Sequence, residues 1–245
     1  MPSAIATSTA AIATAGLVAG GLAYAGLYPN SQIFGRVLIA GRDPRQLALT
    51  YDDGPNPAVT PALLDLLGRY GVRATFFLIG RFVRQQPLLA REIAEAGHLI
   101  GNHSMTHPWL VLQSGERIRQ ELRGTNVLLE DVLGMPVRYF RPPHGARRPY
   151  VIRAANELGL ATVQWNVTAA DWKAIGAQAI AGNVERGIER NQARGSGSNI
   201  LLHDGGHLGL GAERLATTAA TAQILSQYAG DRFVTVDTWD QRKSR

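Results

Sequence analysis

The chain has 245 residues, of which 45% are hydrophobic and 18% charged, a composition that predicts a globular protein with a sizeable buried core. It contains no cysteine, which excludes disulfide bonds, thiolate metal ligands and a cysteine nucleophile. Although 25 basic residues outnumber 19 acidic ones, there is no basic run with interleaved aromatics, so we expect a basic surface and no nucleic-acid partner.

The first 35 residues contain no Asp, Glu, Lys, Arg or His. Within them, residues 4–28 are mostly small and apolar, and the stretch is long enough to span a bilayer core of about 30 Å. The sequence Ala-Tyr-Ala at 23–25 fits a signal cleavage site, whereas three arginines between residues 36 and 45 favour a main domain on the cytoplasmic side. We expect a membrane anchor or export signal, with membrane association through residues 4–28 at the cell envelope. The alternative is a cytoplasmic protein in which this segment packs on the domain or forms a tail.

From residue 46 onward, short runs rich in Val, Ile, Phe and Thr alternate with longer segments of helical spacing. The predicted strands are 46–51, 73–79, 98–102, 137–141, 161–167, 198–203 and 232–236, and the predicted helices are 58–70, 82–96, 114–133, 148–158, 174–192 and 212–229. This alternation predicts a parallel α/β domain, either an open doubly wound sheet or a barrel. We expect one domain at 46–240, preceded by the segment 1–35 and a connector at 36–45 and followed by a tail at 241–245.

Reactive side chains follow five of the predicted strands. The clusters are Asp52-Asp53, His103 to His107, Arg141 to Gly145, Asp171-Trp172 and Leu201 to Asp204. Each cluster has a structural explanation when taken alone, such as a turn, a helix cap or a local ion pair. Taken together they indicate one site, because the carboxyl ends of parallel strands face the same way. The two remaining histidines, His98 and His207, are expected to take no part in the chemistry.

The residue types in these clusters predict a hydrolase. Two imidazoles four residues apart and one carboxylate form a three-ligand zinc site that keeps a position open for water. Zinc lowers the pKa of that water towards 7, a second carboxylate can take its proton, and a further histidine can protonate the leaving group. The expected reaction is hydrolysis of an amide or an ester.

The same residues resemble the five motif blocks of the polysaccharide deacetylase family, also known as the NodB homology domain or carbohydrate esterase family 4, over about residues 46–240. The resemblance implies an α/β fold, a distorted (β/α) barrel of about seven units with mostly parallel strands. By resemblance, the catalytic residues are Asp52 as base, Arg141 as the residue that positions it, His203 as acid and Asp171 as the partner of that acid. The implied metal ligands are Asp53, His103 and His107, and the implied substrate-binding residues are His144, Trp172, Leu201 and Pro143.

Two positions depart from the family pattern. His144 stands where the family usually carries Tyr, and Thr168 stands where it often carries an acidic residue. Since the family uses the backbone N–H at the first position towards the oxyanion, the change leaves that function in place. Neither departure removes a metal ligand, the base or the acid, so an active enzyme is expected.

The expected function is metal-dependent removal of N-acetyl groups from N-acetylglucosamine-containing glycans of the chitooligosaccharide or peptidoglycan type, releasing acetate. Zn²⁺ is the expected cofactor, with Co²⁺ and Ni²⁺ as alternatives that also suit imidazole ligands. The alternative functions are an O-acetyl-xylan esterase or a small-amide or formamide hydrolase with the same metal site, and a glycan-binding protein without catalysis. A serine hydrolase is not expected, because the chain has no Gly-x-Ser-x-Gly motif.

Overall fold

The structure is a computed structural model that describes residues 20–244. Of the expected membrane segment at 4–28, residues 4–19 therefore lie outside the described residues. Residues 20–27 are helical, and the chain then turns towards the domain. Among the residues that the structure describes, no helix has both the length and the apolar character needed to cross a membrane.

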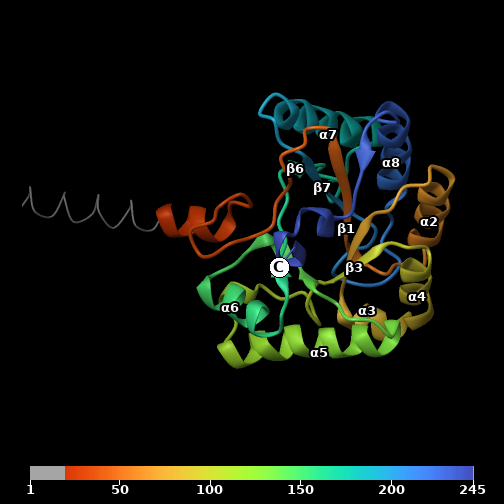
Figure 1. Cartoon of the computed structure of the whole chain (residues 1–245). Helices are drawn as coiled ribbons and strands as arrows, with labels where there is room; N and C mark the ends of the chain where they lie inside the picture. Colours follow the sequence, from red (N-terminus) through yellow and green to blue (C-terminus); the bar gives the residue numbers. More distant parts are fainter. Residues whose placement is uncertain (1–19, 245) are drawn as a thin grey trace, which may run out of the picture.

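One sheet of parallel strands forms the centre of the molecule (Figure 1). The strands are β1 (Gln46–Gly54), β2 (Thr75–Leu78), β3 (Leu99–Asn102), β4 (Tyr139–Phe140), β5 (Ala161–Thr162), β6 (Val167–Thr168), β7 (Ser198–His203) and β8 (Arg232–Phe233). Their order is β5-β4-β3-β2-β1-β7-β6, and β8 pairs with the start of β1. Seven strands thus curl into a half-barrel, which confirms the predicted distorted barrel.

Helices cover the outer face of this sheet (Figure 1). They are α2 (Thr60–Arg69), α3 (Gly80–Gln85), α4 (Pro87–Glu95), α5 (Gly115–Leu133), α6 (Pro149–Glu157), α7 (Ala177–Gln192) and α8 (Leu215–Gln227), with 3-10 turns at Leu110–Leu112, Pro143–Gly145, Val236–Trp239 and Gln241–Ser244. The largest apolar cluster packs between these helices and the strands. The predicted single helix at 82–96 is two helices, because Pro87 lacks the N–H that would continue α3 and instead starts α4.

The predicted strand at 161–167 is also wrong in one respect. It consists of two short strands, β5 and β6, that lie at opposite edges of the sheet. Residues 163–166 cross the open seam of the half-barrel between them. Leu38 forms a parallel bridge with Val163, and the Asn199 side-chain amide donates to the Ile39 carbonyl at 2.9 Å. The expected connector at 36–45 therefore fills the seam and takes part in the barrel wall.

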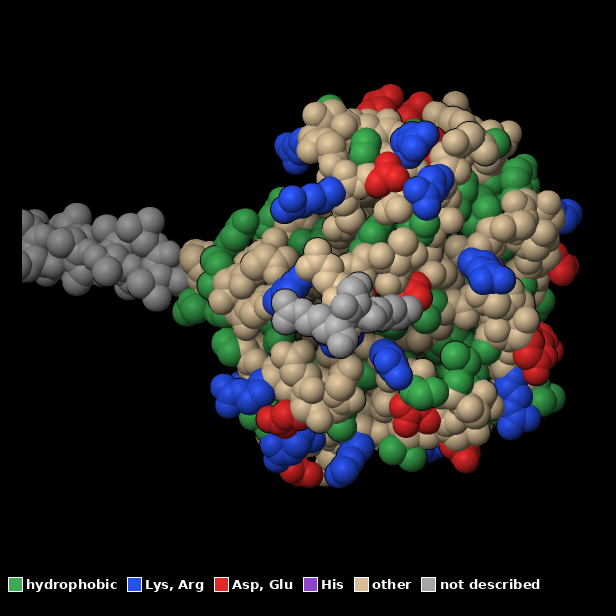
Figure 2. All heavy atoms as spheres, in the orientation of Figure 1, with side chains coloured by type: hydrophobic (Ala, Val, Ile, Leu, Met, Phe, Trp, Pro, Cys, Tyr) green, Lys and Arg blue, Asp and Glu red, His purple; other side chains and the backbone are tan. Residues whose placement is uncertain are grey.

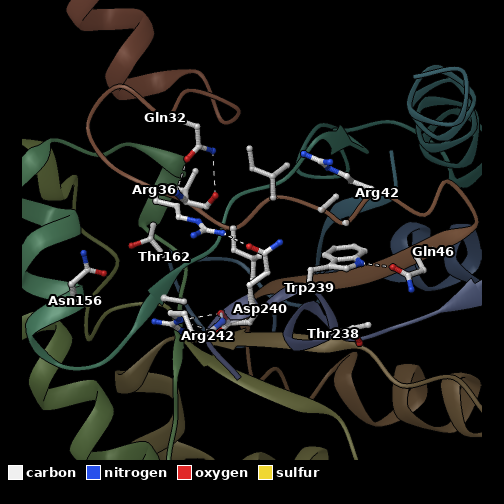
Figure 3. Close-up of a pocket in the computed structure, with 17 residues that line it drawn as sticks. Gln32, Arg36, Arg42, Gln46, Asn156, Thr162, Thr238, Trp239, Asp240 and Arg242 are labelled. Carbon is white, nitrogen blue, oxygen red and sulfur yellow. Dashed lines mark hydrogen bonds and ion pairs between the residues drawn. The ribbon is translucent and has the colours of Figure 1, made fainter. Parts of the chain in front are cut away.

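A polar hollow of about 760 Å³ opens beside this connector, at the amino ends of β1 and β5 (Figure 3). Arg36, Arg42 and Arg242 lie around it, and Trp239 closes one side by donating to Gln46 at 2.6 Å. Figure 2 shows basic side chains scattered among acidic ones over the face drawn there. The hollow lies at the end of the strands opposite to the site described next.

Candidate active site

The carboxyl ends of the strands surround a cavity of about 570 Å³. In the register of β1 and β7, Asp52 stands directly opposite His203. His103 follows β3 and Arg141 follows β4. The carboxyl ends of β1, β3, β4 and β7 therefore meet at this cavity. The cavity is lined by Asp52, Asp53, His103, His107, His144, Gly145, Trp165, Trp172, Leu201, His203, Gly206, His207, Leu208, Gly209, Ala212 and Arg214.

Asp52 is held by a buried arginine. Arg141 is fully buried, and its guanidinium donates to Asp52 Oδ1 and to Thr50 Oγ1, each at 2.8 Å. The same group donates to Asn199 at 3.3 Å and lies 4.2 Å from the centre of the Phe77 ring. These contacts fix one carboxylate oxygen of Asp52 and leave Oδ2 directed towards His103, 3.7 Å from its Nε2. The arrangement suits a carboxylate that must keep one orientation.

The tautomer of His103 follows from its hydrogen bond. Its Nδ1 lies 2.8 Å from the Arg141 carbonyl oxygen, and a carbonyl only accepts. Nδ1 therefore carries the proton and Nε2 offers its lone pair to the cavity, as expected of an imidazole metal ligand. In His107, burial and the neighbouring His103 lower the pKa well below its ordinary value, which favours the neutral form that binds metals.

Local hydrogen bonds shape the loop that carries both histidines. Glu121 on α5 is buried and accepts from the Thr106 N–H at 2.8 Å and from its hydroxyl at 2.7 Å. The His107 N–H donates to Ser104 Oγ at 3.1 Å, and Ser104 N–H donates to Asn102 at 2.8 Å. Ser104 and His107 adopt positive φ values of 64° and 59°, so these bonds hold the loop in an uncommon conformation.

The donor atoms around Asp53 fit a divalent metal ion. Asp53 Oδ1 lies 3.3 Å from His107 Nε2 and 3.5 Å from His103 Nε2, and it is buried without a hydrogen-bond partner. Ligand atoms bound at roughly 2.0–2.1 Å to a tetrahedral zinc ion stand about 3.3–3.4 Å from one another. A buried carboxylate oxygen without a donor is costly, so a cation between these groups explains their convergence.

His207 joins the same group, although the sequence predicted no role for it. Ligand atoms of Asp53, His107 and His207 all lie within 4.8 Å of one another, and the His207 ring stacks on His107 at 4.6 Å. The loop after β7 places it there: Arg214 donates to the Gly205 carbonyl at 2.9 Å. A Cβ at Gly205 would lie 2.2 Å from the Asp53 carbonyl oxygen, so only glycine permits this approach. Because His207 lies beyond the end of β7 and its position depends on the glycine loop in between, no local sequence signal assigned it to the site.

His203 forms a tight pair with Asp171. Its Nδ1 lies 2.8 Å from Asp171 Oδ1, and its backbone N–H donates to Oδ2 at 2.7 Å. Thr217 on α8 also donates to Oδ2, at 2.9 Å. Burial opposes the charge on His203, but the attraction of Asp171, and of Asp53 and Asp52 beyond it, raises its pKa to about 9. The pair therefore favours an imidazolium that can give up a proton.

Aromatic side chains form part of the cavity wall or pack behind it. His144 stacks on Trp109 with ring centres 4.0 Å apart, and its pKa falls to about 4 through burial and the nearby histidines. Trp172 is half exposed and meets His203 edge-on at 5.6 Å. Leu201 lines the floor.

Three further residues differ in their relation to this cavity. Pro143 is buried and does not line it, whereas Trp165, which the sequence pattern did not single out, does. Trp165 lies within the segment 161–167, which was predicted as one strand, so its position at the cavity was not expected. His98 has a structural environment away from the site, where its Nδ1 accepts from the Ala74 N–H at 3.0 Å.

Known proteins are similar to this chain in sequence and in fold. Residues 40–163 match the family model described as polysaccharide deacetylase. The chain is 38% identical over 194 residues to a peptidoglycan-N-acetylglucosamine deacetylase of Bacillus cereus, covering 78% of this chain and 85% of that protein. It is 36% identical over 174 residues to a chitooligosaccharide deacetylase of Azorhizobium caulinodans, covering 71% of this chain and 80% of that protein. A solved structure of a peptidoglycan N-acetylglucosamine deacetylase, in complex with 4-naphthalen-1-yl-N-oxidanyl-benzamide, aligns with a TM-score of 0.74 at 32% identity, over 83% of this chain and 92% of that one. This chain therefore belongs to the polysaccharide deacetylase family.

Proposed function

We propose that the chain is a zinc-dependent polysaccharide N-deacetylase that removes acetyl groups from N-acetylglucosamine units and releases acetate. The observation that carries the proposal is the arrangement of Asp52 and His203. They stand opposite each other on paired strands, one bonded to a buried arginine and the other to a buried carboxylate, beside the carboxylate–imidazole cluster of Asp53. This arrangement supplies a base and an acid at one cavity.

Asp53, His103 and His107 are the proposed metal ligands, with His207 beside them at the rim. When bound, a zinc ion supplies a Lewis acid that lowers the pKa of water and polarises a carbonyl oxygen. Asp52 takes the proton from the attacking water. Arg141 keeps the Asp52 carboxylate in the orientation that this transfer needs, because it occupies Oδ1 and leaves Oδ2 free to face the cluster.

The second half of the reaction needs stabilisation of the oxyanion and protonation of the leaving amine. The turn at His144 presents its backbone N–H to the tetrahedral oxyanion. His203, charged through its contact with Asp171, donates a proton to the departing nitrogen. Trp172 and the Trp109–His144 stack form the aromatic walls against which sugar rings bind.

The names of the relatives support an N-acetylglucosamine substrate, and peptidoglycan or a chitooligosaccharide is the proposed polymer. The test is acetate release from an N-acetylglucosamine oligomer and from acetylated xylan, measured with the same zinc-loaded enzyme. Faster release from the oligomer supports the N-deacetylase. Release from xylan alone would replace it with the O-acetyl esterase.

We also propose that the enzyme works at the cell envelope, associated with the membrane through residues 4–28. The described end of this segment supports the proposal, since Leu22, Tyr24, Leu27, Tyr28 and Ile33 are exposed apolar side chains that continue an uncharged stretch. The test is fractionation of cells that express the full chain. Recovery in the membrane pellet, released by detergent and not by salt, is the expected result, and recovery in the soluble fraction would contradict it.

A further inference from the structure

A buried arginine ties the N-terminal segment to the domain. Arg147 is 1% exposed, and its Nη2 donates to the carbonyl oxygens of Tyr28, Pro29 and Ser31 at 2.9, 3.3 and 2.8 Å. Its backbone N–H donates to the Gly26 carbonyl at 2.9 Å. One residue of the domain therefore binds four backbone carbonyl groups between residues 26 and 31, at the end of the helix at 20–27 and in the segment that follows it. In Figure 1 this segment lies beside the region of α6.

The other arm of the same guanidinium reaches the cavity wall. Nη1 of Arg147 donates to the Gly145 carbonyl at 3.2 Å, and the Gln164 side chain donates to that carbonyl at 3.0 Å. His144 and Gly145 both have positive φ, 58° and 67°. Positive φ is unfavourable for a histidine, so this turn depends on its hydrogen bonds. The Gly145 N–H donates to the Pro142 carbonyl at 2.9 Å and the Ala146 N–H to the Pro143 carbonyl at 3.1 Å, while Arg147 and Gln164 hold the Gly145 carbonyl from outside the turn. Gly145 and His144 both line the cavity.

We propose that residues 26–31 brace the His144–Gly145 turn through Arg147, which makes Arg147 a positioning residue and the N-terminal segment part of the catalytic unit. The proposal rests on the proposed function, in which the His144 N–H faces the oxyanion. Hydrogen-bond donors to an oxyanion act mainly in the transition state, so a displaced turn lowers kcat, and it also raises KM because the His144 ring belongs to the sugar-binding wall.

The glycines of the helix at 20–27 offer a matched pair of variants. A Cβ at Gly26 would lie 3.0 Å from the Arg147 carbonyl oxygen and 3.7 Å from the Phe34 ring, whereas a Cβ at Gly21 meets nothing within 4 Å. Gly26→Val therefore pushes on the brace, and Gly21→Val places the same side chain in the same helix without touching it. Neither glycine is among the residues that line the cavity, and Gly21 also lies outside the brace at residues 26–31.

Two readouts separate the brace from the reaction. Hydrogen–deuterium exchange of the peptide that contains residues 142–147 is expected to rise in Gly26→Val and to stay at the wild-type rate in Gly21→Val. In acetate release, Gly26→Val is expected to lose about tenfold or more in kcat and to show a higher KM, while Gly21→Val keeps the wild-type values. Exchange measures the turn whether or not acetate is released, so an inactive wild type would overturn the proposed function and not the brace.

Variants of the arginine provide the second test. Arg147→Ala is expected to reproduce the kcat loss and the faster exchange, and Arg147→Lys is expected to recover only part of each, since an ammonium lacks the two arms that join Gly145 to residues 28–31. Arg148→Ala is the control, because Arg148 donates to the Gln113 carbonyl and not to the turn. Cobalt affinity should match the wild type in every variant. Equal kcat and exchange in Gly26→Val and Gly21→Val, or a fall in Tm alone, would overturn the brace.

Discussion

His203, the proposed acid, has its pKa raised to about 9 by the neighbouring carboxylate of Asp171. Its partner Asp171 is itself bonded by the backbone of His203 and by Thr217, so the carboxylate cannot rotate away. The pKa of Asp171 falls below its ordinary value, because the charge and hydrogen bonds of His203 outweigh burial. The pair is therefore set up to hold a proton on the imidazole at neutral pH.

The first prediction concerns the pH dependence of this pair. The pKa of His203, the proposed acid, is raised to about 9. We therefore expect kcat to fall as the pH rises to about 9 and His203 loses its proton. In Asp171→Asn the limb should move towards the ordinary imidazole pKa near 6.5, with kcat at pH 8 reduced about tenfold or more. The measurement is kcat against pH for both proteins. An alkaline limb at the same pH in both would contradict the pairing.

The same shift has a consequence for stability. The folded pKa of His203 lies above its unfolded value, so its contribution to the free energy of unfolding is complete below about pH 6.5 and is lost as the pH rises through about 9. Urea unfolding should show this loss in the wild type and a smaller one in Asp171→Asn.

Among the elements, α5 has a role that its sequence does not reveal. Its buried Glu121 holds Thr106 in the loop between the two proposed histidine ligands, and Arg117 pairs with Glu121 at 2.7 Å. The helix itself was predictable, since it begins after the Ser114 cap and ends at Gly134 with φ 66°. The contact of one of its glutamates with a loop 15 residues earlier depends on tertiary packing.

The second prediction tests this support. Glu121→Ala should lower metal affinity about 10–100-fold, the usual effect of losing a residue that orients ligands. Glu116→Ala is the matched control, because Glu116 lies on the exposed face of the same helix and pairs only with Arg119 and Gln120. Titration with cobalt gives both affinities. Equal affinities in the two variants would show that the loop holds its shape without Glu121.

The same elements show which parts of the structure could be predicted. The site residues that follow β1, β3, β4 and β7 could be predicted from the sequence. Alternating strands and helices imply one parallel sheet, and the carboxyl ends of its strands lie at the same edge. The break between α3 and α4 at Pro87 has a local cause, the proline, but the helical spacing of apolar residues continues across it and predicted one helix. The crossing at residues 163–166 had no local signal, because its alternation of apolar and polar residues fits a strand as well as a segment that crosses the seam beside Leu38. His207 was missed for a related reason, since its place over His107 depends on the glycine loop after β7.

At the scale of the whole molecule, the structure connects three parts that the sequence analysis treated as separate: the N-terminal segment, the connector and the domain. Residues 26–31 are tied to the cavity wall through Arg147, the connector fills the barrel seam, and the strand ends carry the carboxylate–imidazole cluster of the candidate metal site. A chain that begins at residue 36 lacks the carbonyl partners of a buried guanidinium. Experiments on this enzyme therefore use the full chain.

The third prediction is that metal binding stabilises the whole fold. Ligand present at 100 times its Kd adds about 2.7 kcal/mol to the free energy of unfolding, which corresponds to a rise in Tm of about 5–10 °C for a chain of this size. Differential scanning calorimetry of chelator-treated protein, before and after zinc addition, measures the rise. Asp53→Ala should abolish it, because the shared ligand oxygen is lost. A zinc-dependent rise of the same size in Asp53→Ala would place the ion elsewhere.

Acetate release by the full chain is the most direct test of the central claim that this cavity performs metal-dependent deacetylation. The protein is stripped of metal, resupplied with zinc and given an N-acetylglucosamine oligomer, with Asp52→Asn treated in parallel. We predict release that requires zinc in the wild type and is abolished in Asp52→Asn, while that variant still binds zinc, because Asp52 bonds Arg141 and is not a proposed ligand. Release without metal, or release at the wild-type rate by Asp52→Asn, would contradict the account.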